Sequence, residues 1–259
     1  MYIDSHAHLN DKAFENERKQ IVENYLSVGV NKIINAAFDL DSSKLGQALA
    51  DEFESVYFSA GVHPEYAHTV NDGCILGLKE IIKDKKCVAV GEAGLDYHYE
   101  GYDKKVQAVA FERQLQLAKD SKLPIIIHSR DATEDMVNIL KGNKELLEYS
   151  GVMHCFSGSK ETAKIFLDMG LYISFSGVVT FKNAPILQEV ARYVPRDRYL
   201  AETDCPYMAP VPNRGKQNQP AYVKFVYQKL AELKEIEEEV CVKEIVNNTL
   251  TLFKGLKNG

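Results

Sequence analysis

Eight short apolar segments recur along the chain, and longer amphipathic stretches separate them. Several of the short segments are apolar at consecutive positions, which is typical of parallel strands buried on both faces of a sheet. They cover residues 2–4, 32–36, 56–60, 87–91, 124–128, 151–154, 171–174 and 199–202. This alternation predicts repeated strand–helix units and a parallel sheet covered by helices.

The stretches between these segments show helical periodicity in their apolar residues. The clearest apolar stripe consists of Val223, Val226, Leu230 and Leu233, whose spacing places all four side chains on one face of a helix. We expect this face to pack against the core. The acidic run over residues 232–239 falls between two expected helices, and we interpret it as solvated surface.

Eight such units in 259 residues predict a closed (β/α)8 TIM-type barrel that occupies residues 1–259 as a single domain. The alternative is an open doubly wound sheet. That fold requires a glycine-rich phosphate-binding turn after the first strand, and the sequence has none there. The irregular segment over residues 207–220 follows the last predicted strand, where a barrel carries loops of its functional face.

The composition is that of an ordinary soluble globular protein, with 45% hydrophobic and 26% charged residues. The net charge of −6 gives no general basic surface for nucleic acid. The longest apolar runs are too short to span a membrane, and the first residues contain an acid and two histidines where a signal peptide is apolar. Five cysteines without a C-x-x-C pair indicate free thiols, so we predict a cytoplasmic protein.

Metal-binding side chains lie where the predicted strands end. His6 and His8 are two residues apart in an extended segment, so their imidazoles point to the same side. The carboxyl ends of all barrel strands meet at one mouth, which would gather residues that are distant in sequence. The other strand ends carry Glu92, His128, His154 and Asp204. Each could simply be a polar residue that ends a strand, but six such coincidences favour one metal site.

Four histidines and two carboxylates exceed the needs of one zinc ion, so we predict two divalent ions bridged by a carboxylate. Glu92 is the expected bridge. His6 and His8 would hold one ion, and His128 and His154 the other. Asp204 would bind an ion, orient the attacking water or accept its proton. The ions could be zinc, manganese, nickel or magnesium. They would make the mouth positive and supply a metal-bound hydroxide to attack a phosphodiester.

Six ordered motifs resemble the TatD-type metal-dependent deoxyribonucleases of the amidohydrolase superfamily. The motifs are SHAHLN, GVHPEY, GEAGLDY, IHSR, HCFSGS and ETDCPYMAPVPNRGKQNQP, and they extend to about residue 222. The resemblance implies a (β/α)8 barrel that hydrolyses phosphodiester bonds in DNA. It also implies that the metal ligands are His6, His8, Glu92, His128, His154 and Asp204. Asn213 and Gln217 depart from the usual family pattern, which affects substrate preference rather than chemistry.

Further residues are candidates for contact with substrate. His63 ends the third predicted strand, where it would touch the scissile phosphate or donate a proton; alternatively it is a structural histidine fixed by Pro64. Arg130, Arg214 and Lys216 are expected to bind phosphate, although each could be ordinary surface charge. The proposed catalytic residues are Glu92, Asp204 and His63. Aromatic side chains beside the motifs could stack on bases or simply pack: Tyr97, Phe156 and Tyr207.

The predicted substrate is DNA, as single strands or ends, because the acidic surface disfavours contact with duplex outside the mouth. No membrane and no obligate protein partner are expected. Two alternatives stay open. One is a hydrolase of a small amide, lactone or aminoacyl-tRNA ester, because the same ions would polarise a carbonyl. The other is a metal-binding protein without catalytic activity.

Overall fold

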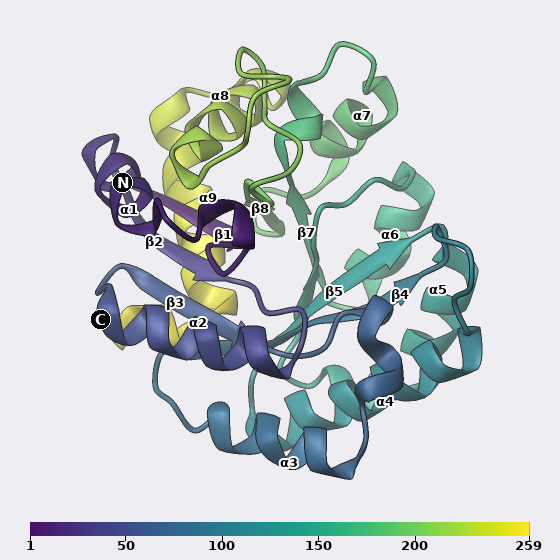
Figure 1. Ribbon diagram of the computed structural model, residues 1–259. Helices are drawn as coiled ribbons and strands as arrows, with labels where there is room; N and C mark the ends of the chain where they lie inside the picture. Colours follow the sequence, from purple (N-terminus) through teal and green to yellow (C-terminus); the bar gives the residue numbers. More distant parts are fainter. Residues whose placement is uncertain (259) are drawn as a thin grey trace.

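A ring of parallel strands forms the centre of the molecule (Figure 1). The computed structural model describes residues 1–258. Within them, the strands pair in chain order from β1 to β8, each parallel to the next. Their bounds are β1 Tyr2–Ala7, β2 Val30–Asn35, β3 Val56–Ala60, β4 Cys87–Asp96, β5 Ile125–Arg130, β6 Gly151–Met153, β7 Tyr172–Phe175 and β8 Tyr199–Ala201.

Helices surround the strands (Figure 1), so the fold is the predicted (β/α)8 TIM barrel. The helices between strands are α1 Arg18–Ser27, α2 Leu40–Glu52, α3 Asp72–Ile81, α4 Lys104–Ser121, α5 Thr133–Gly142, α6 Lys160–Asp168 and α7 Pro185–Tyr193. After β8 come α8 Val223–Leu233 and α9 Glu238–Leu252. All four residues of the stripe predicted in α8 are buried, which confirms that this face packs on the core. The acidic run lies where α8 gives way to α9, as expected.

Hydrogen bonds just beyond the paired strands join β1 to the segment after β8. The amide of Asp204 donates to the carbonyl of His6 at 2.9 Å, and the amide of His8 donates to the carbonyl of Cys205 at 2.9 Å. The Asp4 carboxylate reinforces this junction by accepting from the amide and the hydroxyl of Thr203. The first and last elements of the barrel therefore meet where His6, His8 and Asp204 lie.

Side chains inside the barrel close its amino-terminal end. In β2, Ile34 belongs to an interior cluster, whereas its neighbour Ile33 packs against the helices, as the two-residue period of a strand requires. The interior cluster continues onto Leu252, Phe253 and Leu256 at the end of the chain. This apolar plug fills one end of the barrel, so the polar residues collect at the opposite, carboxyl end of the strands.

Strand β4 is longer than predicted. The apolar pattern suggested a strand over residues 87–91 that stops at Glu92, but pairing with β5 continues to Asp96 after a register shift between Val90 and Ala93. Glu92 therefore lies within the strand at this irregularity. Gly94 permits the extension, because a Cβ atom at this position would collide with the backbone oxygen of His128. The extension carries Asp96 to the same end of the barrel.

No helix in the described part of the chain is long and apolar enough to cross a membrane. The predicted loop over residues 207–220 holds neither an α-helix nor a strand. All five cysteines are free, as the sequence indicated.

Candidate metal centre

Two histidines from the end of β1 converge on one point. The Nε2 atoms of His6 and His8 lie 3.2 Å apart, and both rings are almost fully buried. The Asp204 Oδ1 atom is 3.6 Å from the Nε2 of His6 and 3.2 Å from that of His8. Asp204 has a left-handed backbone with φ of 54°, a conformation that Asp tolerates better than most residues. The closure of β8 onto β1 thus brings a carboxylate to the histidine pair.

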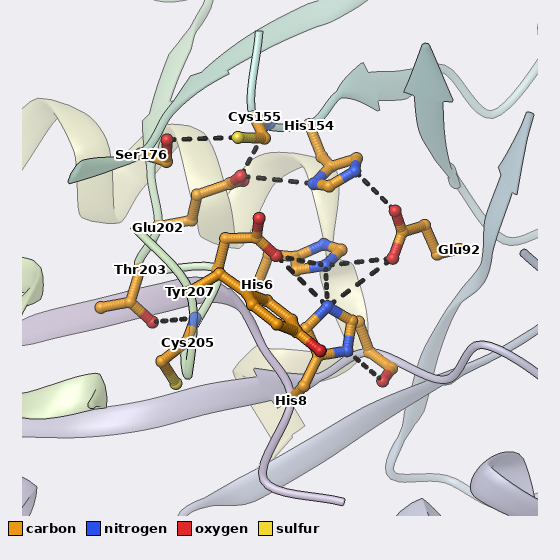
Figure 2. Close-up of polar contacts among 12 residues, drawn as sticks. His6, His8, Glu92, His154, Cys155, Ser176, Glu202, Thr203, Cys205 and Tyr207 are labelled. Atoms are coloured by element: carbon orange, nitrogen blue, oxygen red, sulfur yellow. Dashed lines mark hydrogen bonds and ion pairs between the residues drawn. The ribbon is translucent and has the colours of Figure 1, made fainter. Parts of the chain in front are cut away.

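Glu92 lies between two groups of histidines. Its Oε2 atom is 3.4 Å from the Nε2 of His6 and 3.7 Å from the Nε2 of His8. Its Oε1 atom is 2.7 Å from the Nδ1 of His128 and 2.7 Å from the Nε2 of His154. Each carboxylate oxygen therefore faces its own pair of imidazoles. The structure brings together all six residues that the sequence placed at strand ends, and the distances place Glu92 between the two histidine pairs. Figure 2 labels four of the six: His6, His8, Glu92 and His154.

Hydrogen bonds on the outer edges of the rings fix which nitrogens are free. The Nδ1 of His8 lies 3.1 Å from the carbonyl of Ala36, to which it can only donate. The Nε2 of His128 lies 3.0 Å from Asp96 Oδ2, an arrangement in which the ring again donates. A neutral imidazole then presents a lone pair at its other nitrogen. Histidine ligands of metals typically make this outer hydrogen bond to a carbonyl or a carboxylate.

The free nitrogens face other acceptors, and this arrangement fits a cation. His8 Nε2 points to the Asp204 and Glu92 oxygens. His128 Nδ1 lies 3.1 Å from His154 Nε2, with Glu92 Oε1 beside both. Lone pairs that converge in a buried space need positive charge between them. The donors are imidazole nitrogens and carboxylate oxygens, a set that binds Zn, Mn or Ni readily. The residues therefore fit a divalent metal.

The pKa directions agree with positive charge at this place. Burial disfavours charge on His154, yet Glu92 and Glu202 raise its pKa well above the ordinary value. Burial also disfavours ionisation of Glu92, yet the surrounding histidines, His154 foremost, hold its pKa well below the usual range. Asp204 is likewise buried, and its hydrogen bond with His8 lowers its pKa. Both carboxylates are therefore ionised at neutral pH and available as ligands.

His63 lies beside the cluster, but it presents an N–H donor where His8 and His128 present lone pairs. Its Nδ1 accepts a hydrogen bond from the amide of Glu65 at 3.2 Å, so the proton of the neutral ring is on Nε2. That Nε2 lies 3.7 Å from Glu92 Oε1, and the His63 ring meets the His128 ring edge-on with centroids 4.4 Å apart. Burial lowers the pKa of His63 to about 3. At neutral pH His63 thus presents an N–H to the mouth.

Two buried acids of the centre were missed by the sequence reasoning. Asp96 binds the outer nitrogen of His128, and Glu202 Oε1 lies 3.4 Å from His154 Nδ1. Both residues directly follow apolar strand residues, which was the signal used for the six predicted ligands. Asp96 was overlooked because β4 seemed to end at Glu92. Glu202 was overlooked because Asp204 was taken as the residue that ends β8.

The expected phosphate-binding residues lie at the same end of the barrel but outside the cluster. Arg130 is exposed at the end of β5 and stands 5.3 Å from the ring of Tyr99. Arg214 and Lys216 are exposed in the loop after β8, and Arg214 stands 4.3 Å from the ring of Phe181. Within residues 1–258, none of these three cations forms a hydrogen bond or an ion pair with the six clustered residues.

The three aromatic candidates differ in accessibility. Phe156 is buried against Phe166 and therefore packs in the core rather than offering a stacking face. Tyr97 stacks on Tyr102 with centroids 4.8 Å apart, and its hydroxyl donates to an acid of α5. Tyr207 is 53% exposed and lies edge-on to His8, with ring centroids 6.2 Å apart. Tyr207 alone among the three presents an open ring beside the cluster.

A (β/α)8 barrel with histidines and acids clustered at the carboxyl ends of its strands defines a class of metal-dependent hydrolases. Comparison with known proteins leads to the same class of enzyme. The sequence matches the family described as TatD related DNase over residues 3–254. The chain therefore belongs to this family and is a metal-dependent hydrolase.

Individual relatives match nearly the whole length of the chain. YabD of Bacillus subtilis, named as an uncharacterized metal-dependent hydrolase, is 41% identical over 254 residues, covering 98% of this chain and 99% of YabD. YcfH of Escherichia coli K12, described in the same words, is 39% identical over 255 residues, covering 97% and 95%. The crystal structure of YJJV, a TatD homolog from Escherichia coli K12, superposes with a TM-score of 0.92 at 31% identity, covering 98% of each chain.

Proposed function

We propose that this protein is a deoxyribonuclease that hydrolyses phosphodiester bonds at a centre of two divalent ions. One observation carries the proposal: the two oxygens of Glu92 face two separate pairs of histidines. The first ion would be held by His6, His8, Glu92 and Asp204, and the second by Glu92, His128 and His154. The choice of DNA as substrate is supported by the name of the matched family.

The ions, when bound, supply Lewis acidity and a source of hydroxide near neutral pH. In this proposal Asp204, whose lowered pKa keeps it ionised, would orient a water molecule and accept its proton. His63 contributes a hydrogen bond from Nε2 toward the phosphate oxygens as negative charge builds on them. Its low pKa makes it a neutral donor rather than an imidazolium acid.

Exposed groups around the mouth suit a single strand or a strand end. Tyr99 and Tyr207 are 55% and 53% exposed, and rings of this kind stack on unpaired bases of any sequence. Arg130, Arg214 and Lys216 are exposed and would contact phosphates on either side of the scissile bond. The net charge of −6 disfavours broad contact with duplex DNA.

Removal of the His63 donor should slow the reaction and leave metal binding intact. We expect His63→Ala to lower kcat roughly 10- to 100-fold, because a hydrogen bond to a charged group contributes about 1.5–3 kcal/mol. His63→Gln, which restores an N–H donor, should recover part of the rate. Steady-state kinetics and metal analysis of both variants check this prediction. A normal kcat in His63→Ala, or loss of metal from it, would contradict the role of His63.

A second candidate function is hydrolysis of an aminoacyl ester, and one observation favours it. A cavity of about 290 Å³ opens beside Asp96 and is lined by Tyr99 together with the acids Glu65, Glu100 and Asp103. Acidic walls repel phosphate but attract the ammonium group of an amino acid. The same ions would polarise the ester carbonyl.

A substrate panel decides between the two functions. The purified protein, loaded with Mn²⁺ or Zn²⁺, is assayed on end-labelled single-stranded and duplex oligonucleotides, on an aminoacyl-tRNA and on a simple lactone. We expect cleavage of oligonucleotides, fastest for single strands, and none by the Glu92→Gln variant. Hydrolysis of the aminoacyl ester with no cleavage of any oligonucleotide would overturn the proposal in favour of the second candidate.

A further inference from the structure

The rings of His6 and His154 stack face to face in the centre, although one belongs to each histidine pair. Their centroids are 4.1 Å apart and their planes differ by 10°. The Nε2 atoms of both rings lie near Glu92, at 3.4 Å from Oε2 for His6 and 2.7 Å from Oε1 for His154. Each ring therefore turns its other nitrogen, Nδ1, away from the shared carboxylate.

A second carboxylate, Glu202, lies on this other side. Figure 2 shows His154 between Glu202 and Glu92. A ring nitrogen of His6, a ring nitrogen of His154 and a carboxylate oxygen of Glu202 all lie within 4.8 Å of one another. The Nε2 of His6 is already surrounded by His8, Glu92 and Asp204, so Nδ1 is the atom left for Glu202.

Buried atoms without partners mark the place where these groups meet. Glu202 is 0% exposed, and its Oε1 accepts from the amide of Cys155 at 2.7 Å. Its Oε2 atom, the Nδ1 of His6 and the Nδ1 of His154 are buried without a hydrogen bond. Polar atoms buried in this way carry a substantial free-energy cost unless a partner is reached. Glu202 is therefore a buried carboxylate close to two ring nitrogens that have no other partner: its Oε1 lies 3.4 Å from His154 Nδ1, and its Oε2 has no hydrogen bond.

We propose that Glu202 is a positioning residue that accepts the Nδ1–H protons of His6 and His154 and so directs one ligand of each metal ion. The inference rests on the proposed two-ion centre. An imidazole that binds metal through Nε2 carries its proton on Nδ1, and an acceptor for that proton fixes the tautomer and the ring orientation. One buried carboxylate thereby supports both halves of the centre.

A third metal ion is the other possible occupant of this cluster, and the ligand geometry disfavours it. Such an ion would take the Nδ1 atoms of His6 and His154 while their Nε2 atoms serve the ions beside Glu92. Both imidazoles would then have to lose their second proton. Two protons shared with Glu202 satisfy the same three atoms without this loss.

The test compares two conservative variants. Glu202→Gln leaves one neutral oxygen, which the Cys155 amide and His154 Nδ1 would have to share, and replaces the second carboxylate oxygen by an N–H₂ group that cannot accept a proton. Asp96→Asn is the matched control, because Asp96 contacts His128 and thus a ligand of the second ion only. Zn²⁺ is titrated calorimetrically into metal-free protein, and the visible spectrum of bound Co²⁺ reports the geometry of each site. Melting curves of the metal-free variants verify folding.

We expect Glu202→Gln to weaken both binding steps by roughly 10- to 100-fold, as is typical for the loss of an outer hydrogen bond to a metal ligand. Asp96→Asn should weaken one step and leave the other unchanged. If the wild-type protein binds two ions and Glu202→Gln binds both normally, or loses only one, the role of Glu202 is wrong while the proposed centre stands. A third equivalent of Zn²⁺ also overturns it. If the wild-type protein binds fewer than two ions, the two-ion centre itself fails and this inference with it.

Discussion

Replacing Glu92 by Gln should abolish hydrolysis, with a loss of at least about 100-fold, the scale seen when one group that stabilises transition-state charge is removed. Glu92 is the only one of the six clustered residues whose oxygens reach both histidine pairs. The amide keeps the size of the side chain but presents an N–H₂ group to one pair. We therefore expect the metal content to fall from two ions to at most one. Oligonucleotide cleavage and metal analysis of the purified variant provide the measurement.

The fold of the Glu92→Gln variant should stay intact, because the hydrophobic core and the apolar plug of the barrel are far more extensive than this one buried group. A cooperative melting transition and an unchanged circular dichroism spectrum serve as the control. If the variant keeps a tenth of the wild-type rate, or still binds two ions with wild-type affinity, Glu92 does not bridge the centre.

Removing the metal should have the second largest effect. We expect treatment with a chelator to lower activity at least 100-fold, on the same reasoning about charge stabilisation, and re-addition of a suitable divalent ion should restore it. Binding to the folded state alone also stabilises the protein, by about 2.7 kcal/mol for each ion present at 100 times its Kd. The metal-free protein should therefore melt at a lower temperature.

Calorimetric melting with and without chelator tests this expectation. Activity measured after addition of Zn²⁺, Mn²⁺, Ni²⁺ or Mg²⁺ ranks the ions by the rate that each one supports. The Glu92→Gln variant is the matched control, since its melting temperature should respond much less to chelator. A wild-type protein whose melting temperature and activity are both insensitive to exhaustive chelation would exclude a catalytic metal.

The apolar faces of the helices and the apolar segments of the strands could be predicted from the sequence, because both patterns are set by the spacing of residues that are close along the chain. The four apolar residues of α8 are buried as the spacing predicted, and β3 has the predicted bounds. The boundary of β4 could not be read this way. Its last residues are held by pairing with His128 and Ser129 of β5. A local sequence pattern cannot predict pairing with residues that lie more than thirty positions away.

The sequence by itself determined the barrel and the six residues gathered at its mouth, because the strand ends of a parallel barrel converge wherever the strands lie in the sequence. Only the tertiary structure decided how those residues divide between the two oxygens of Glu92, and only it showed His63 as an N–H donor. It also placed Asp96 beside His128 and Glu202 beside His154. These assignments depend on which edge of each ring faces a carboxylate, a matter of a few ångströms set by strand register and by the closure of β8 onto β1.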